Sequence, residues 1–184
     1  MKTKKIVISG SAGTGKTSVI NALNTKGYYC FEEVIRSLTS EITKEVDMVN
    51  QISNPIVFAK DPLDFNIRLL KGRINQFQQG SLLDETLCFF DRGIPDVLAY
   101  MDFFNQKYDA LFTDACNEHV YTSVFILPPW KAIYKTDSGR FESFDEVLKI
   151  HDHLETTYKK FGYNVMEVPF GTVAERTNFI LNNI

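Results

Sequence analysis

Cysteine is scarce in this chain, and long apolar runs are missing. The three cysteines are an odd number, which argues against a framework of disulfide bonds, and Cys30 and Cys88 stand in apolar segments, where a thiol fills space in a core. No apolar run approaches the roughly 18 residues that span a bilayer. The apolar run that follows Met1–Lys5 is too short for a signal peptide. We therefore expect a cytoplasmic protein without a transmembrane segment.

An excess of positive charge is also lacking, since the formal net charge is −3. A general nucleic-acid-binding surface is not expected from this balance, although a local basic patch is compatible with it. The sequence has no repeat, low-complexity segment or Gly/Ser-rich linker. It therefore predicts a single domain over residues 1–184, whose oligomeric state stays open.

What the sequence does contain is a phosphate-binding motif. The pattern G-x-x-x-x-G-K-[ST] is matched by the eight residues Gly10, Ser11, Ala12, Gly13, Thr14, Gly15, Lys16 and Thr17. All four of its defined positions agree: Gly10, Gly15, Lys16 and Thr17. The motif follows the apolar run Ile6–Ile8 and precedes a helix-forming stretch, which is the setting in which such a loop works. The alternative is a glycine-rich turn with a chance lysine. The agreement of motif and flanks favours a site for a nucleoside triphosphate, ATP or GTP.

Each part of the motif has an expected role. The glycines let the loop turn its backbone N–H groups toward a phosphate, and the following helix adds the positive end of its dipole. Lys16 is expected to reach the β- and γ-phosphate oxygens, and the hydroxyl of Thr17 to ligate Mg²⁺. The expected nucleotide-binding set runs from Gly10 to Ser18, and Lys16 is also expected to take part in catalysis.

Short apolar segments alternate with helical patterns along the chain. Strands are expected at about Lys5–Ser9, Tyr28–Glu32, Thr86–Phe90, Val124–Leu127 and Val165–Val168. Helices are expected at about Lys16–Lys26, Val34–Glu45, Pro95–Phe104 and Ala110–Asn117, from Ser143 to about Phe161, and after Thr172, the last two with capping boxes. This order predicts an α/β fold of the P-loop NTPase, kinase-like type: a five-stranded parallel sheet with helices on both faces, in three layers. Ligands of such sheets bind at the carboxyl ends of the strands.

A further helical pattern over residues 55–79 breaks at Asp61 and Pro62, where Asp can cap a helix and Pro can occupy its first turn. A buried stripe is expected at helical spacing after this break: Leu63, Ile67, Leu70, Ile74 and Phe77. We expect the stripe to end at Gly80.

The third expected strand delivers Asp91 to the ligand-binding edge. An apolar strand that ends in Asp is a Walker-B pattern, in which the carboxylate helps to hold magnesium. The alternative is that Asp91 only begins the turn before Gly93. The phosphate motif upstream favours a metal-binding or catalytic role. The next residue, Arg92, can contact phosphate or pair with a carboxylate, and its role stays open, as does that of Asp96.

The second expected strand ends in two acids, Glu32 and Glu33. Either can orient an acceptor hydroxyl or take its proton, and the alternative is a solvent-facing helix start, where acids are common. Alternation from Tyr29 and Phe31 directs Glu33 toward the buried side. We therefore favour Glu33 as the carboxylate of this pair that takes part in catalysis.

Residues 130–142 form an expected polar loop that carries Lys131, Lys135 and Arg140. As a lid over the phosphates, such a loop would neutralise charge and exclude water, and the alternative is a solvated surface loop. Arg140 is the favoured catalytic cation, because the capped helix that follows can anchor it.

Other charged residues are interpreted as ordinary surface groups. These include Arg68 and Arg73, with Arg36 as the favoured exception beside the strand-two acids, and the histidines His151 and His153, whose spacing makes a poor metal pair. The guanine signature [NT]-K-x-D is absent, and so is an Asp-x-x-Gly switch motif. A conventional GTPase is therefore not expected.

Taken together, the motifs resemble those of a family of small P-loop proteins described as predicted ATPases, the AAA_28 type. The segments that carry the resemblance are Gly10–Thr17, Phe31–Arg36, Asp91–Asp96, Pro128–Trp130 with Ile133 and Tyr134, and Asp137–Arg140 with Glu142–Phe144. Their order covers nearly the whole chain. The resemblance implies the fold of nucleoside and nucleotide kinases and, more distantly, of nicotinamide riboside kinase domains. One animal relative is described as binding GTP and phosphoinositide. The resemblance thus implies the fold and nucleotide binding, and it does not supply a substrate.

Two functional hypotheses remain. In the first, the protein is a phosphotransferase that binds ATP or GTP with Mg²⁺ through Lys16, Thr17 and Asp91, while Glu33 and Arg140 act on a small-molecule acceptor such as a nucleoside or nucleotide. In the second, nucleotide binding orders the 130–142 loop and regulates a partner surface, with only weak hydrolysis. The strand-two acids and the Asp-Arg-Gly run favour the enzyme.

Overall fold

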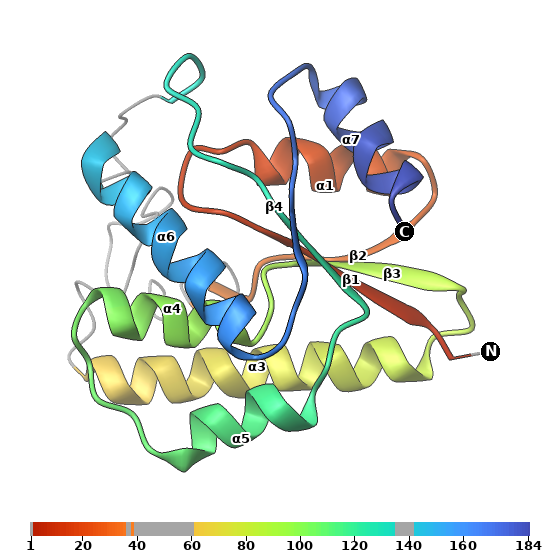
Figure 1. Ribbon diagram of the computed structural model, residues 1–184. Helices are drawn as coiled ribbons and strands as arrows, with labels where there is room; N and C mark the ends of the chain where they lie inside the picture. Colours follow the sequence, from red (N-terminus) through yellow and green to blue (C-terminus); the bar gives the residue numbers. More distant parts are fainter. Residues whose placement is uncertain (1, 36–37, 39–60, 135–141) are drawn as a thin grey trace, which may run out of the picture.

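The computed structural model describes residues 2–35, 38, 61–134 and 142–184, and its centre is a five-stranded sheet (Figure 1). The strands are β1 (Lys4–Ser9), β2 (Tyr29–Phe31), β3 (Leu87–Asp91), β4 (Ser123–Ile126) and β5 (Val165–Glu167). They lie in the order β2-β3-β1-β4-β5, and every neighbouring pair is parallel. The phosphate motif follows β1, which is the central strand.

Helices cover both faces of this sheet. They are α1 (Lys16–Thr25), α3 (Pro62–Leu82), α4 (Pro95–Phe103), α5 (Ala110–Glu118), α6 (Phe144–Lys160) and α7 (Val173–Asn182). In Figure 1, α1 and α7 lie on one face and α3, α4, α5 and α6 on the other. The predicted three-layer α/β fold is confirmed. The helix expected over residues 34–45 falls largely outside the described residues.

Alternation along the strands builds a separate apolar core on each face. On β1, Ile6 and Ile8 pack in the core beneath α1 and α7, whereas Val7 packs in the core beneath α3, α4 and α5. On β3, Phe89 joins the first core and Phe90 the second. Each such fully buried side chain contributes roughly 1.5–3 kcal/mol. The sheet is held from both sides, so its carboxyl edge is a firm support for a site.

The caps expected from the sequence are present. The side chain of Asp61 accepts hydrogen bonds from the first turn of α3. Ser143 with Glu146, and Thr172 with Glu175, form complete capping boxes at the starts of α6 and α7. These local signals fix where three helices begin, because each cap satisfies backbone N–H groups that the helix leaves open.

The stripe expected on α3 is confirmed except at its first residue. Leu70 is buried in the core and Ile67, Ile74 and Phe77 pack against it, whereas Leu63 is 48% exposed. The fully buried side of the helix also carries Phe65, Asn66, Leu69 and Arg73. The helix also continues past Gly80 to Leu82, and Gly80 itself is buried. A Cβ at that position would lie 2.9 Å from Cζ of Phe90. This glycine therefore marks a close approach of helix to sheet and not a helix end.

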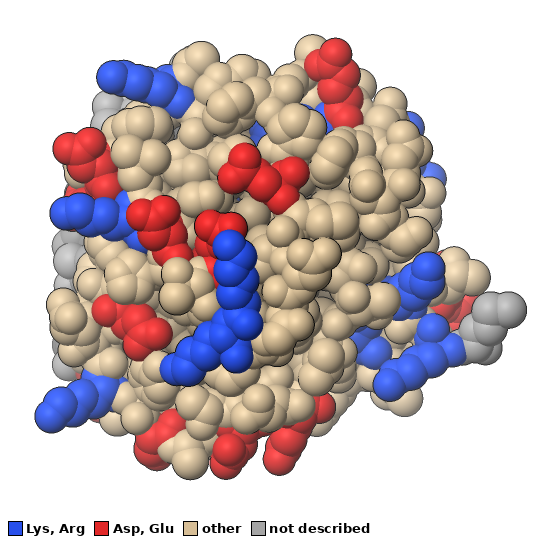
Figure 2. Space-filling model, viewed as in Figure 1, with Lys and Arg blue, Asp and Glu red and all other residues tan. Residues whose placement is uncertain are grey.

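The surface carries both signs of charge. On the face drawn in Figure 2, acidic and basic side chains are interspersed. The exposed pair Arg68–Asp64, at 2.9 Å, agrees with the surface position expected for Arg68. Among the described helices, none has both the length and the apolar character needed to cross a membrane.

The expectation that His151 is a surface residue is wrong. His151 is only 8% exposed on the inner side of α6, and its Nε2 lies 3.7 Å from a carboxylate oxygen of Glu167. Burial lowers the pKa of His151, with a partial opposing effect from Glu167. His153 lies two positions along the helix and packs edge-on against Phe103. The two rings thus take different faces, as their spacing predicted.

Candidate active site

The phosphate motif forms a tight loop between β1 and α1. Gly10, Gly13 and Gly15 have φ values of 144°, 73° and 86°, a region that side chains rarely adopt. A Cβ on Gly10 would also lie 2.6 Å from the backbone oxygen of Leu127. These positions explain why the motif needs glycine here, since both the backbone conformation and the available space exclude a side chain.

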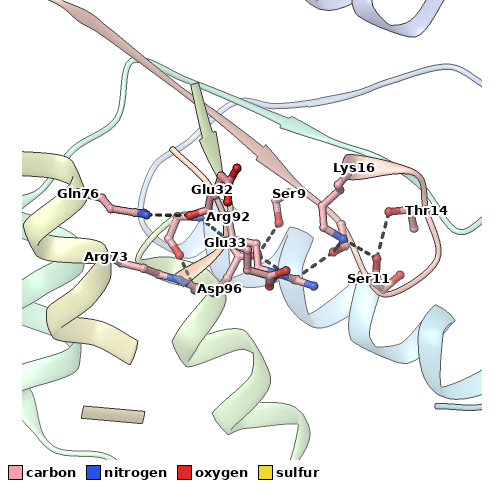
Figure 3. A network of polar contacts seen from close by, with 12 residues as sticks. Ser9, Ser11, Thr14, Lys16, Glu32, Glu33, Arg73, Gln76, Arg92 and Asp96 are labelled. Carbon is pink, nitrogen blue, oxygen red and sulfur yellow. Dashed lines mark hydrogen bonds and ion pairs between the residues drawn. The ribbon is translucent and has the colours of Figure 1, made fainter. Parts of the chain in front are cut away.

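Lys16 is folded back onto its own loop (Figure 3). Its Nζ donates hydrogen bonds to the backbone oxygens of Gly10 at 2.7 Å and Ser11 at 2.8 Å. Burial lowers the pKa of Lys16 to about 8, with a further lowering from Arg92 and an opposing effect of nearby carboxylates. The ammonium group is therefore held at the mouth of the loop in a poorly hydrated position, where an anion would stabilise its charge.

The two residues expected to hold a metal lie at neighbouring element ends. Thr17 is exposed in the first turn of α1, and Asp91 is 4% exposed at the end of β3. Both offer oxygen ligands, which Mg²⁺ prefers. No group of three or more His, Cys, Asp or Glu residues gathers into a metal cage in the described ranges. This donor set fits Mg²⁺, an ion that completes its shell with phosphate oxygens and water.

Arg92 joins the two strand ends that the sequence singled out. Its Nε donates to Oε1 of Glu33 at 2.5 Å, and its Nη1 donates to the backbone oxygen of Gly10 at 3.1 Å. The residue has a φ of 74°, which turns its side chain back across the site. Of the two roles left open for Arg92, pairing with a carboxylate is present in this structure.

Glu33 lies inside this network, whereas Glu32 does not (Figure 3). The side chain of Glu33 is 17% exposed, and Glu32 is exposed and contributes its backbone oxygen to a hydrogen bond from Gln76. Burial alone would raise the pKa of Glu33, but Arg92 and then Lys16 outweigh it and lower the pKa. The alternation argument therefore placed the correct member of the pair on the buried side.

Asp96 is the centre of a second set of contacts. Its carboxylate accepts hydrogen bonds from Ser9 Oγ at 2.7 Å, from the Gly93 N–H at 2.9 Å and from the hydroxyl of Tyr158. Arg92 Nη1 lies 3.4 Å away. Burial would raise the pKa of Asp96, but positive charge and these hydrogen bonds lower it. The carboxylate is fully buried, so it acts as an anchor for the residues around it.

Arg73 corrects the sequence-based expectation of a surface charge. It is 2% exposed on α3, and its Nη1 donates to the backbone oxygen of Gly93 at 2.7 Å. The available signal was its position three and four residues after Leu70 and Leu69, which places it on the buried side of the helix. A second arginine, from α3, thus supports the turn that Arg92 belongs to.

Two contacts of residues 170–176 were not predicted from the sequence. Trp130 and Phe170 follow β4 and β5, and their rings stack with centroids 5.1 Å apart. Arg176 on α7 donates from Nη2 to the backbone oxygen of Thr14 at 2.7 Å. Local sequence pattern gave no reason to connect residues 170–176 with the phosphate motif. Only the packing of α7 beside α1 brings them together (Figure 1).

The predicted lid cannot be placed in the same way. Arg140 and Lys135 lie outside the described residues, and so does Arg36. Lys131 is described and is exposed just beyond Trp130, with its Nζ 6.0 Å from the ring centre of Phe144.

Comparison with known proteins agrees with this architecture. The model of the AAA_28 family, described as an AAA domain, matches residues 5–176. A nucleotide-binding protein of Pseudomonas fluorescens (strain SBW25) is 28% identical over 80 residues, which are 44% of this chain and 26% of that protein. This chain therefore spans only about a quarter of the length of that relative.

Two solved structures share the fold. Deoxyadenosine kinase from M. mycoides, solved with dCMP and dCDP, has a TM-score of 0.64 at 18% identity and is covered over 97% of both chains. The NadR protein in complex with NR has a TM-score of 0.71 at 15% identity over 98% of this chain and 49% of the other. At these identities the likeness shows the P-loop kinase fold.

Proposed function

Because the chain belongs to the AAA_28 family, we propose that it binds ATP or GTP and transfers the terminal phosphoryl group to a small hydroxyl-bearing acceptor, such as a nucleoside or nucleotide. The single observation that carries this proposal is the partly buried carboxylate of Glu33, fixed by Arg92 beside the phosphate loop. A loop that only binds nucleotide does not need a carboxylate at this place. A phosphotransferase does, because the acceptor must be oriented and must lose a proton.

Nucleotide binding would rest on the loop over residues 10–18. Its N–H groups and the start of α1 favour a polyanion, and Lys16 would exchange its contacts with the loop oxygens for phosphate oxygens. Thr17 and Asp91 would hold Mg²⁺, which would neutralise phosphate charge when bound. The aromatic faces of Trp130 and Phe170 are the kind of surface on which a base stacks.

The transfer itself would need little covalent help from the protein. The acceptor oxygen forms a bond to the γ-phosphorus while the bond from that phosphorus to the β,γ-bridging oxygen breaks, and the nucleoside diphosphate leaves. The hydroxyl proton would pass to Glu33. Arg92 binds Oε1, and within the described residues Oε2 accepts no hydrogen bond, so Oε2 is the oxygen that can take the proton. Glu33 is ionised at neutral pH, and its lowered pKa makes it a weak base that would take the proton only as the bond to phosphorus forms. Arg140 remains our candidate for the cation that closes on the transferred group.

A nucleotide-dependent binding module is the second candidate. The observation that favours it is the close Glu33–Arg92 pair itself, since it engages the carboxylate that a kinase would use. In that case the pair would serve to hold the strand ends together, and loss of the proton-accepting group would matter little.

The test compares Glu33→Gln with its neighbour Glu32→Gln. ADP formation would be measured with Mg²⁺-ATP and a panel of nucleosides, nucleotides and sugar alcohols, and ATP affinity by calorimetry. We expect one acceptor to stimulate ADP release. Glu33→Gln should reduce that rate about 10²–10⁴-fold while ATP affinity changes little, because the amide cannot accept the proton.

Glu32→Gln is the matched control, since Glu32 is exposed and offers only its backbone oxygen to Gln76. It should turn over like the wild type. A background rate with every acceptor, or equal rates for both variants and the wild type, would contradict the kinase proposal and favour the binding module.

A further inference from the structure

The terminal helix reaches the phosphate loop through one buried arginine. Arg176 is 4% exposed, and its Nη2 donates to the backbone oxygen of Thr14 at 2.7 Å. Its Nη1 lies 2.8 Å from the point where a Cβ of Gly15 would stand. The guanidinium is thus pressed against the peptide that links these two loop residues, in the space that the glycine leaves open.

Burial of the Arg176 guanidinium is unfavourable for the stability of the fold. Within the described residues Arg176 has no carboxylate partner, and its Nε is buried without a hydrogen bond. The adjacent acid, Glu175, is engaged by the N–H and hydroxyl of Thr172 in the capping box. Burying a charge with so little compensation destabilises a protein, and an apolar side chain would fill the space at lower cost. A purely structural role therefore explains the residue poorly.

The geometry of the peptide bond explains it better. The C=O of Thr14 and the N–H of Gly15 belong to one planar trans peptide, so they point in opposite directions. A donor that holds the carbonyl on the α7 side turns the N–H toward the interior of the loop. A cation on the carbonyl also polarises the peptide and strengthens the N–H as a donor.

We propose that Arg176 is a positioning residue for the phosphate loop, which orients the Gly15 N–H toward a nucleotide phosphate by holding the Thr14 carbonyl. The proposal deepens the nucleotide binding put forward above and rests on it. On this proposal α7 does more than cover the sheet, because it carries the cation that orients the Gly15 N–H.

The test uses Arg176→Gln and Arg176→Lys, with Ile180→Ala as the matched control. Ile180 is fully buried on the same helix, so its truncation weakens the packing of α7 without removing a contact to the loop. ATP affinity with Mg²⁺ would be measured by calorimetry, and the melting temperature alongside it. Arg176→Gln should weaken binding roughly tenfold to a hundredfold. Arg176→Lys, which keeps a charged donor, should recover part of the loss. Ile180→Ala should lower the melting temperature with affinity within about twofold of the wild type.

A second readout needs no nucleotide. The amide ¹H and ¹⁵N shifts of Gly15 in the free protein report the polarisation of its peptide, and they should move in Arg176→Gln but stay in place in Ile180→Ala. If Arg176→Gln does not fold, the Arg176→Lys variant carries both comparisons. Wild-type affinity in Arg176→Gln together with an unchanged Gly15 resonance would overturn the inference. Absence of both ATP and GTP binding in the wild type would instead refute the proposed function, and the Gly15 shifts would still decide whether Arg176 shapes the loop.

Discussion

Lys16 is a buried cation whose hydrogen bonds go to backbone oxygens. Its ammonium group is buried and bonded to the backbone oxygens of its own loop, and its pKa falls to about 8. A bound polyphosphate would favour the charged form and raise this pKa again. Charge on Lys16 and nucleotide binding are therefore linked equilibria.

This linkage predicts a pH dependence of nucleotide affinity. At about pH 7 and below, the free protein already carries the proton, so affinity should be nearly constant there. Above pH 8 the free protein loses the proton while the complex keeps it, so affinity should fall by up to about tenfold per pH unit. Calorimetric titration with ATP between about pH 7.5 and 9.5 would measure it. In this range the terminal phosphate is fully ionised, since its pKa is about 6.

The same titration contains its own check. In two buffers with different ionisation heats, binding at pH 9 should take up close to one proton and binding at pH 7.5 only about a quarter of one. Constant affinity and no buffer dependence would mean that Lys16 keeps its proton in the free protein.

Some residues of the site could be predicted from the sequence, and others could not. The phosphate loop was predictable because its function depends on backbone shape, and glycine at Gly10 and Gly15 records that shape directly. Arg73 and Arg176 were not, because their partners lie on other elements, and only tertiary packing brings them there. A local pattern identifies local geometry, and long side chains on helices can reach far beyond it.

The helix α3 lies close to the sheet at one point. Gly80 faces Phe90, which is buried and stacked on Phe31 with ring centres 4.7 Å apart. The aromatic ring cannot easily move, because it is enclosed on both sides. The distance between helix and sheet is thus set at a position where no side chain intervenes.

Replacement of Gly80 by Ala tests this contact. Helix propensity alone would stabilise the variant by about 1 kcal/mol. The added methyl group would approach Cζ of Phe90 at 2.9 Å, and overpacking of this kind costs about 1–3 kcal/mol. We expect a net loss of about 1 kcal/mol in the free energy of unfolding, measured by urea denaturation.

The neighbouring residue provides the comparison. Ser81 is exposed and its hydroxyl bonds back to the oxygen of Phe77, so Ser81→Ala should be neutral or slightly stabilising, by about 0.5 kcal/mol. If Gly80→Ala proved more stable than the wild type, the contact with Phe90 would be softer than its geometry indicates.

Elements were predicted well where a local rule fixes them. The capping boxes at Ser143 and Thr172 mark true helix starts, and the cap at Asp61 marks a third. The stripe on α3 was correct from Ile67 to Phe77 but not at Leu63, which is exposed although Phe65 in the same turn is buried. Periodicity shows that a helix has an apolar side, but which residues reach the sheet depends on where the helix crosses it.

Across the whole molecule, Asp96 connects elements that are distant in sequence. It receives Ser9 from β1, Gly93 from the turn after β3 and Tyr158 from α6. Two arginines, Arg73 and Arg92, supply the positive charge that keeps it ionised. The network lies beneath the phosphate loop, so the stability of the fold and the shape of the site have a common support.

The variant Asp96→Asn should therefore destabilise the whole molecule. The amide removes the buried negative charge that faces Arg73 and Arg92, leaves Arg92 paired with Glu33 alone among the described residues and offers one acceptor oxygen in place of two. We expect a loss of about 3 kcal/mol in the free energy of unfolding. Urea denaturation followed by two spectroscopic probes would measure it and show whether unfolding stays cooperative.

A variant of an exposed carboxylate is the control for the loss of stability expected in Asp96→Asn. Asp64→Asn removes the surface pair with Arg68, whose side chain is 56% exposed, and should cost about 0.5 kcal/mol or less. Similar losses in the two variants would show that the Asp96 network contributes no more than a surface contact.

The site as a whole was predictable to the extent that parallel strands bring their carboxyl ends to one edge. This rule alone placed Glu33, Asp91 and the phosphate loop together. The side-by-side position of β2 and β3, which lets Arg92 reach Glu33, was not contained in any local pattern. It follows from the order of strands, which is settled by packing over the entire sheet.

That order also governs how a newly made chain can assemble. The strand β1 pairs on one side with Leu87–Asp91 and on the other with Ser123–Ile126, both much later in the chain. Until the ribosome has synthesised β4, one row of the N–H and C=O groups of β1 has no native neighbour. The unpaired edge and the apolar side chains of β1 can then mispair. The strand that leads into the phosphate loop is thus made before both of its neighbours and is enclosed late, so chaperones can bind it in the meantime.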